Sequence, residues 1–340
     1  DINWTSEATR GTYIGEARAI RALCYFDMVR LWENIPLLDI PTTDNISQAN
    51  PDDVYQLIIS DLKYAAENIP ANAYPKAQAA SNDGHITKYA AEALLARVYL
   101  FYSGYYGKEP AGLTRAEALA GVEDVIASGE FGLIDEFKNL WPAASVTWTT
   151  NNDGSHTKTN TYAGRGNVET VLAQKFNYTS DYNGNADGNA WQVMIALRNL
   201  IAVPYGQGWG GCTVNPKLVN SFQSGDTRST ASIIDCEAEG LVDHDNFSLL
   251  YNDQREYTGY AIKKYSPLAI WQQAEDGTWS EINEVMGKDI GAGEYQLSPY
   301  QDFIVVRYSD VLLMAAELGS PNAQSYLDAC LLYTSPSPRD

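Results

Sequence analysis

The stretch from 15 to 38 predicts a helix that is apolar on more than one side. Two apolar stripes recur at helical spacing, and the charged residues are spread between them instead of forming one polar face. A helix with two apolar sides packs against several neighbours, so the fold must supply further helices. Pro36 then ends the helix, because proline disfavours a helical residue before it and has no amide hydrogen to donate. The two stripes are Ile20, Leu23, Cys24, Met28 and Leu31, and Ala19, Ala22, Phe26, Val29 and Trp32.

Capping residues predict three more helices in the first 130 residues. A capping asparagine followed by proline stands at 50–51, Thr87 caps an alanine-rich segment, and Thr114 with Glu117 forms a capping box. Two consecutive pairs of antiparallel helices with an alanine-rich seam are similar to tetratricopeptide packing, although a strict repeat is not visible. A further helix at 305–318 is expected to cover the remaining face.

The composition excludes several classes of protein. At 340 residues and 45% hydrophobic, the chain is long enough to bury a substantial core as one large or two modest domains. Its formal net charge is −20, and such a surface repels phosphate backbones, so we expect no nucleic-acid partner. No run of about 18 apolar residues occurs, and we therefore expect no transmembrane helix.

The middle of the chain has a different composition. Residues 145–212 contain nine Asn and nine Gly, with Trp and Tyr scattered among them, and this composition is typical of loops and turns. Short helices are expected at 189–200 and 215–222. Loops held by a rigid scaffold are frequent binding sites, so we expect function to reside in this region.

Five blocks of the chain resemble the motifs of the SusD/RagB family, in the same order. Members of that family are surface lipoproteins of Gram-negative bacteria that capture glycans or peptides for an outer-membrane transporter. The resemblance covers nearly all of residues 10–320. The blocks are GEARAIRALCYFDMVRLWENIPLL at 15–38, HITKYAAEALLARVYLF at 85–101, the segment 205–228 that ends in Asp226-Thr227-Arg228, GYAIKKYSP at 259–267 and VVRYSDVLLMAAE at 305–317.

The resemblance implies a mainly α fold of tetratricopeptide-like helical hairpins with a long, irregular, loop-rich ligand-binding region. We expect residues 1–340 to be a fragment of a single SusD-like domain, with a helical scaffold at 10–130 and 303–329 and a binding region at 131–302. The signal peptide, the lipid-attachment cysteine and the N-terminal segment of the family are not in this chain. Residues 330–340, CLLYTSPSPRD, read as the translation of a sequencing adapter and are expected to be an artefact.

The resemblance also implies a function without catalysis. The chain is expected to bind a nutrient oligosaccharide at the cell surface and to deliver it to a SusC-like TonB-dependent transporter in the outer membrane. A lipid anchor at the N-terminus of the whole protein is expected to hold it there. The alternatives are a peptide-binding, RagB-like member, a glycoside hydrolase and a protein-binding helical-repeat scaffold.

Aromatic and amide side chains of the loop-rich region are the predicted ligand contacts. Sugar rings present apolar C–H faces that stack on Trp and Tyr, while neighbouring amides hydrogen-bond to the hydroxyl groups. Some of these rings must also hold the loops in place. The predicted ligand-binding residues are Tyr182, Asn183, Asn185, Trp191, Tyr205, Gln207 and Trp209.

No catalytic, cofactor or metal motif is present. The three histidines stand in separate contexts, and none lies at helical spacing from another. The acidic stretch 181–189 resembles a calcium loop but has Ala186 where an EF-hand needs glycine and Gln192 where it needs glutamate. We therefore predict no catalytic residue, no cofactor and no bound metal, with calcium as a minor hypothesis.

Three of the four cysteines lie outside the adapter-like tail. Cys24 is expected to be a core thiol, because it lies within an apolar helix. Cys212 and Cys236 could form a disulfide, but their spacing does not require it.

Charges within the helical blocks are expected to form internal pairs instead of ligand contacts, because these helices are predicted to be buried. The residues are Arg18, Arg21, Arg307 and Asp310.

Overall fold

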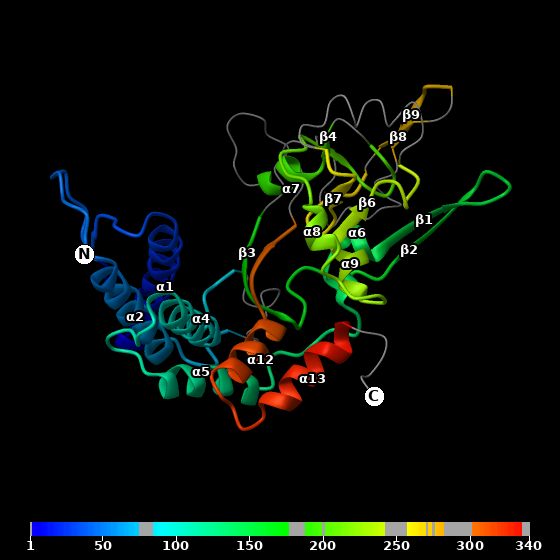
Figure 1. Cartoon of the computed structure of the whole chain (residues 1–340). Coiled ribbons are helices and arrows are strands. Elements are labelled where there is room, and N and C mark those ends of the chain that lie inside the picture. The colour runs from blue at the N-terminus through cyan, green and yellow to red at the C-terminus, as the bar shows by residue number, and fades with distance from the viewer. Residues whose placement is uncertain are drawn as a thin grey trace. The chain divides into compact units, whose positions relative to one another are not determined.

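A computed structural model describes most of the chain (Figure 1). The chain divides into two compact units. Unit 1 comprises Asp1–Leu133, Gly166–Ala173 and Ile304–Cys330, and unit 2 comprises Ile134–Arg165, Gln174–Phe303 and Leu331–Asp340. None of the helices in the described ranges combines the length and the apolar content of a membrane span. The described residues are 2–74, 84–176, 188–198, 201–241, 257–269, 271–273, 276–281 and 301–334.

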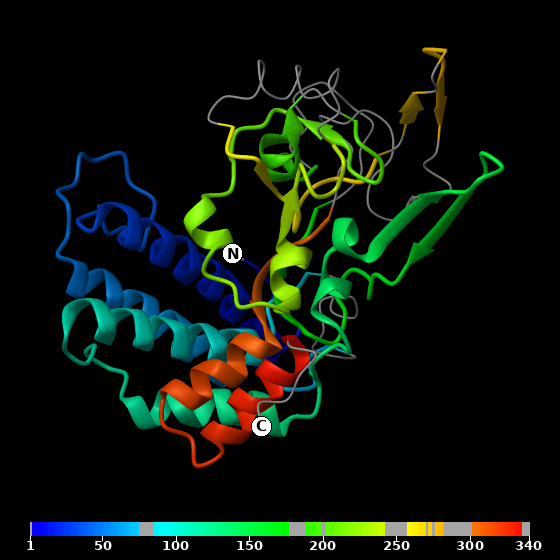
Figure 2. The ribbon, with the colours of Figure 1, turned by 45° about the vertical axis from the view of Figure 1, so that its right-hand side comes forward.

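Unit 1 is built from helices that pack in chain order, α1 on α2, α2 on α4, α4 on α5 and α5 on α12, as Figure 2 shows. The architecture confirms the predicted mainly α fold with tetratricopeptide-like hairpins. Strands β3 (Thr170–Gln174) and β10 (Phe303–Arg307) pair with each other before α12. The helices are α1 (Glu7–Trp32), α2 (Pro51–Asn68), α4 (Lys88–Tyr106), α5 (Arg115–Ala127), α12 (Tyr308–Glu317) and α13 (Ala323–Thr334).

The helix starts follow the predicted caps. The side chain of Asn50 accepts a hydrogen bond from the amide of Asp52, and Thr87 does the same for Ala90. Thr114 and Glu117 form the reciprocal capping box at the start of α5. Each cap satisfies an amide that has no partner inside its helix, which fixes where the helix begins.

Of the two apolar stripes of α1, one is buried within the described residues and the other is covered only in part, by the packing of Leu23 and Met28 against the core. Ala19, Ala22, Phe26 and Val29 are buried in the core of unit 1. On the other stripe, Ile20 and Leu31 are 52% and 72% exposed, and Trp32 at the end of the buried stripe is 64% exposed. The helical period defines both stripes but does not specify how many neighbours pack against the helix.

Cys24 also lies on the exposed side of α1, so the prediction of a core thiol is wrong. Cys24 is exposed for the same reason as Ile20 and Leu31. The neighbouring helices α2 and α4 both pack against the side of α1 that carries Ala22 and Phe26.

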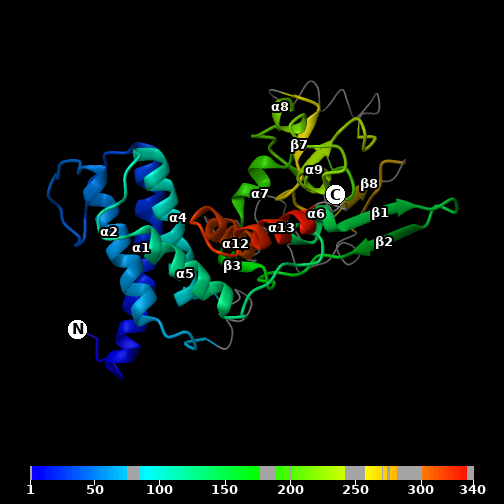
Figure 3. The same ribbon diagram turned by 60° about the horizontal axis from the view of Figure 1, so that its bottom comes forward.

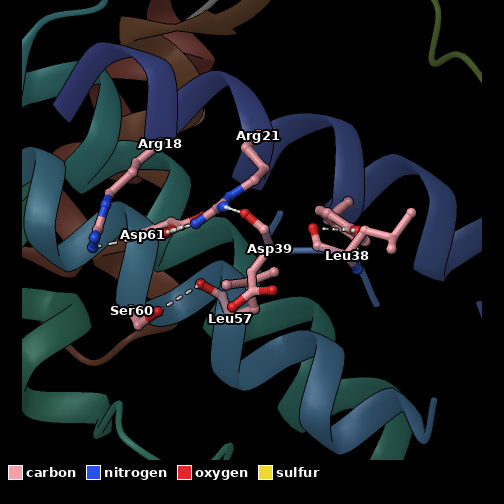
Figure 4. Close-up of polar contacts among 8 residues, drawn as sticks. Arg18, Arg21, Leu38, Asp39, Leu57, Ser60 and Asp61 are labelled. Atoms are coloured by element: carbon pink, nitrogen blue, oxygen red, sulfur yellow. Dashed lines mark hydrogen bonds and ion pairs between the residues drawn. The ribbon is translucent and has the colours of Figure 1, made fainter. Parts of the chain in front are cut away.

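The charged residues of the helical blocks pair internally, as predicted. Arg21 binds the carboxylate of Asp61 through two parallel hydrogen bonds, from Nε at 2.7 Å and from Nη2 at 2.8 Å (Figure 4). Arg18 reaches the same carboxylate at 3.9 Å. Arg307 pairs with Asp310 at 3.1 Å at the start of α12. These side chains therefore stabilise the scaffold.

Glu92 on α4 gives unit 1 a pH-dependent stability. Its side chain is largely buried, and Lys88 shares its ammonium group between Glu92, at 3.1 Å, and Asp124 on α5. Burial raises the pKa of Glu92 to about 7, against the opposing effect of Lys88. Because the folded-state pKa exceeds the ordinary value of 4.5, this group destabilises the fold progressively as the pH rises through about 7.

We expect Glu92→Gln to stabilise the protein at pH 8 by roughly 2 kcal/mol and to have little effect at pH 4, because glutamine mimics the protonated acid. Urea unfolding at both pH values measures this. The matched control is Glu109→Gln, since Glu109 is exposed and accepts a hydrogen bond from Tyr99 at 2.7 Å. An equal effect of Glu92→Gln at both pH values would contradict the titration.

Unit 2 consists of short helices and two-stranded sheets. β1 and β2 form a long antiparallel ribbon, visible in Figure 3. The apolar cluster of unit 2 includes Val146, Leu197 and Ile234. The helices are η1 (Phe137–Leu140), α6 (Pro142–Ser145), α7 (Ala190–Ile195), α8 (Pro216–Val219) and α9 (Thr227–Ser232). The strands are β1 (Val146–Thr150), β2 (His156–Asn160), β4 (Leu197–Arg198), β5 (Gln207–Gly208), β6 (Ile233–Asp235), β7 (Tyr260–Ile262), β8 (Trp271–Gln273) and β9 (Trp279–Glu281).

The predicted short helices correspond to α7 and α8, each shorter than predicted. The predicted limits of the helical scaffold, at 130 and 303, lie close to the unit boundaries at 133 and 304. The description of 1–340 as a fragment of one domain stays a prediction.

Candidate ligand-binding site

The segment that carries Trp209 lies along α7. The amide of Trp209 donates a hydrogen bond to the carbonyl of Val193 at 2.7 Å, and the amide of Gly210 donates to that of Ala196 at 3.0 Å. β5 pairs in parallel with β4, with Leu197 opposite Gln207. Trp209 is therefore carried by a loop whose backbone is anchored on both sides of the ring.

Three glycines allow this close packing. A Cβ atom at Gly208 would lie 2.6 Å from the Cβ of Ala196 and closer still to the carbonyl oxygen of Val193. At Gly206 it would lie 2.8 Å from the carbonyl oxygen of Leu268, and at Gly211 2.9 Å from that of Met194. The glycines of the 205–211 motif thus allow the backbone to approach α7 and the 268 segment.

Large apolar side chains are exposed at this corner of unit 2. Trp191 and Met194, one helical turn apart on α7, are 58% and 42% exposed, and Trp209 is 45% exposed. The guanidinium of Arg198 donates to the carbonyl oxygen of Trp209 at 3.0 Å. We define these four residues as the α7 site: two indole rings and a thioether, with one cation beside them. Exposed apolar groups that are held together on neighbouring segments are typical of a contact surface.

A buried amide network holds α7. Asn189 caps the helix by accepting from the amide of Trp191 at 3.1 Å, and its own amide group donates to the carbonyl of Gln301 at 2.7 Å. The side-chain amide of Gln192 donates to the side-chain oxygen of Gln301 at 3.1 Å. The backbone amide of Gln301 donates to the side-chain oxygen of Gln192 at 3.2 Å. All three side chains are at most 2% exposed. The network therefore fixes the helix that presents Trp191 and Met194.

Tyr205 is buried, with only 4% of its surface exposed. Its hydroxyl donates to Glu239 at 2.5 Å, and Lys263 donates to the same carboxylate at 2.7 Å. Burial raises the pKa of Tyr205, and the neighbouring Glu239 adds to the effect. The ring therefore holds the loop in place in this structure, although its assignment as a ligand contact stays a prediction. Gln207 is partly exposed on β5.

The other predicted contacts, Tyr182, Asn183 and Asn185, lie outside the described residues, as does most of the calcium-like stretch 181–189. Asn189 and Gln192, at its end, make the buried amide network instead. In the ranges that the structure does describe, no group of three or more His, Cys, Asp and Glu side chains could hold a metal ion. Sequence reasoning missed Met194 and Arg198. The one-turn spacing of Met194 from Trp191 is the signal that could have identified it.

Residues 3–100 match a family model described as starch-binding, associating with outer membrane. SusD-like protein P38 of Formosa agariphila is 25% identical over 326 residues, which are 91% of this chain and 54% of that protein. This chain thus spans about half the length of that curated relative.

Solved structures share the fold. A laminarin-binding SusD-like protein superposes with a TM-score of 0.68 at 24% identity, over 97% of this chain and 65% of that one. Surface glycan-binding protein A from Bacteroides thetaiotaomicron, in complex with laminarihexaose, superposes with a TM-score of 0.70 at 18% identity, over 99% and 64%. The paired helices and the loop-rich second unit thus define a SusD-like fold. The resemblance to the SusD/RagB family is thus confirmed by the sequence of residues 3–100 and by the fold of the chain.

Proposed function

We propose that this protein binds a glycan at the cell surface and that the α7 site makes the contact. The observation that carries the proposal is the exposure of Trp191 and Trp209 on a segment fixed by backbone hydrogen bonds and a buried amide network. Relatives of the same fold support it, since one is named as laminarin-binding and another was solved with laminarihexaose. Binding is an equilibrium event that neither makes nor breaks a covalent bond.

The chemistry of the α7 site suits neutral sugar rings. Indole rings offer flat faces to the C–H groups of a sugar, and Gln207, outside the α7 site on the neighbouring β5, offers an amide to its hydroxyl groups. A formal net charge of −20 disfavours polyanionic glycans. Neutral oligosaccharides are therefore the proposed ligand class, and a peptide is the runner-up.

The proposed partner and location rest on the resemblance to the family. We propose that the whole protein is anchored in the outer membrane by a lipid and delivers its ligand to a SusC-like TonB-dependent transporter. The family model, described as associating with the outer membrane, supports this location. Co-purification of the full-length protein with a TonB-dependent transporter would test the partnership.

We expect Trp209→Ala to weaken oligosaccharide binding by about fivefold, because stacking on one ring contributes about 1 kcal/mol. The melting temperature should not change, since the ring is half exposed. Isothermal titration of full-length protein with laminarihexaose and other neutral oligosaccharides measures the first quantity, and calorimetry the second.

Trp32→Ala is the matched control, because Trp32 is 64% exposed on α1 in the other unit. Trp32→Ala should alter neither the affinity for oligosaccharides nor the melting temperature. Equal loss of binding and of melting temperature in Trp209→Ala would make Trp209 a packing residue. Retention of peptides but of no oligosaccharide would instead identify a RagB-like member.

A further inference from the structure

One side of α1 stays exposed over about five turns. The exposed side chains recur at alternating intervals of three and four residues, which align them along one line of the helix. Tyr13 and Ile20 are each 52% exposed, and Leu31 is 72% exposed. Alternating intervals of three and four residues are the pattern by which one helix packs against another. We name this line the α1 seam, and its members are Tyr13, Ala17, Ile20, Cys24, Asp27 and Leu31.

The α1 seam contains large and small side chains in alternation. Tyr13 precedes Ala17, and Ile20 precedes Cys24. The ring of Trp4 stacks on that of Tyr13, with 6.0 Å between the ring centroids, and enlarges the apolar surface at this end. Large side chains of one helix fill the spaces above small side chains of another, so a line of this kind can interdigitate with a second helix. The described residues of this chain leave that surface exposed.

Two ion pairs of the same polarity flank the apolar part of the α1 seam. Glu7 and Arg10 pair at 3.3 Å near the start of α1, and Asp27 and Arg30 pair near its end. In both pairs the acid comes first along the chain and the base follows three residues later. A second copy of the helix that runs in the opposite direction would therefore set a base against each acid. Exposed pairs contribute little stability by themselves, so their charges are available to a facing helix.

We propose that a second copy of this chain packs its α1 seam against this one, antiparallel, about a two-fold axis that passes between positions 18 and 19. The symmetry places Arg10 opposite Asp27 of the second copy, and Glu7 opposite Arg30 of the second copy. Both charge pairs occur twice, once at each end of the contact. The inference does not depend on the proposed glycan site.

The same register matches the apolar side chains by size. It places Tyr13 opposite Cys24 of the second copy and Ala17 opposite Ile20 of the second copy, and each of these contacts also occurs twice. Every large side chain thus faces a small one, as close helix packing requires. The contact removes exposed apolar surface of both copies from water, which drives their association.

Other registers fit the charges less well. A parallel pair of helices would place Arg10 beside Arg10 and Asp27 beside Asp27, and like charges at such positions are destabilising. An antiparallel pair shifted by seven residues would place Arg10 against Ile20 or against Asn34, depending on the direction of the shift. The guanidinium would then face no carboxylate. The charge pattern therefore selects the antiparallel register centred between positions 18 and 19.

Two single variants test the charges of this register. Arg10→Glu sets a glutamate against Asp27, and Asp27→Arg sets an arginine against Arg10, so each variant alone should lower the association constant at least about tenfold. An equal mixture of the two variants should associate like the wild type, because one chain then carries both acids and the other both bases. Sedimentation equilibrium of the full chain measures association, at physiological salt, which screens the net charge of −20. A mixture as weakly associated as the single variants would overturn the register.

Cross-linking tests the same register by distance. Tyr13→Cys, in a Cys212→Ser background because Cys212 is also exposed, places a thiol opposite Cys24 of the second copy. A short bismaleimide should join the two copies and link the tryptic peptides 11–18 and 22–30. Without Tyr13→Cys no covalent dimer should form through Cys24, since the two Cys24 residues lie about 16 Å apart along the helix axis. Peptide 22–30 linked to itself would instead indicate parallel helices and overturn the register.

Ile20→Glu tests the apolar centre of the contact. It sets a carboxylate against Ala17 of the second copy and should leave the protein monomeric at every concentration. Leu313→Glu is the matched control, because Leu313 is 40% exposed on α12 and lies outside the α1 seam. Leu313→Glu should associate like the wild type. A wild-type protein that stays monomeric at every concentration, or an equal loss of association in Leu313→Glu, would overturn the proposal.

Discussion

Replacing Arg21 with alanine is expected to lower the free energy of unfolding by about 3–5 kcal/mol, because it leaves a buried carboxylate without its partner. Asp61 on α2 is 1% exposed and accepts two parallel hydrogen bonds from Arg21 on α1. Arg18, at 3.9 Å, is too distant to replace them. Urea denaturation followed by circular dichroism measures the loss, provided that unfolding is two-state.

Two further variants separate the buried charge from other effects of the truncation. Arg21→Lys keeps the positive charge but cannot form two parallel bonds, so it should lose part of the stability. Arg10→Ala removes a pair with Glu7 on the exposed part of α1 and should cost less than about 1 kcal/mol. A cost for Arg21→Ala as small as that for Arg10→Ala would mean that the Asp61 carboxylate does not need its partner.

Gly208→Ala is expected to cost at least about 3 kcal/mol and to abolish glycan binding at the same time. The new methyl group would meet the backbone of Val193 and the Cβ of Ala196, neither of which can move without shifting α7. Trp209 and Trp191 would then lose their fixed positions. Chemical denaturation and titration with the same oligosaccharides measure the two effects.

Gly104→Ala is the matched control for this substitution. Gly104 lies on α4, where an added Cβ meets nothing within 4 Å. Alanine there should stabilise the protein by about 0.5–1 kcal/mol, because glycine is the poorer helix former. Trp209→Ala should lose binding without losing stability, whereas Gly208→Ala should lose both. Unchanged binding in Gly208→Ala would show that the 205–211 segment does not position the ligand contacts.

The helical unit was largely predictable because its signals are local. The caps at Asn50, Thr87 and Thr114 act on amides within three residues, so the sequence contains both partners. The burial of α1 was predicted only in part. Whether Cys24 is covered depends on how many neighbours reach its side of the helix, and the helical period of α1 does not contain that information.

The site was less predictable because its contacts are remote. Tyr205 is buried by Glu239 and Lys263, which stand more than 30 positions further along the chain. Nothing around Tyr205 distinguishes it from the exposed Trp209 four residues later. The glycines between them are a local signal of close backbone approach, although the sequence does not say that α7 is the element they approach.

The network of Asn189, Gln192 and Gln301 has a consequence for the conditions under which the α7 site is formed. All three side chains are amides, which neither gain nor lose a proton in the pH range of aqueous biology. The scaffold, by contrast, contains in Glu92 a carboxyl group that titrates near neutrality. The hydrogen bonds that hold α7 and present Trp191 are thus decoupled from acidity, whereas the stability of the helical unit varies with the pH of its surroundings.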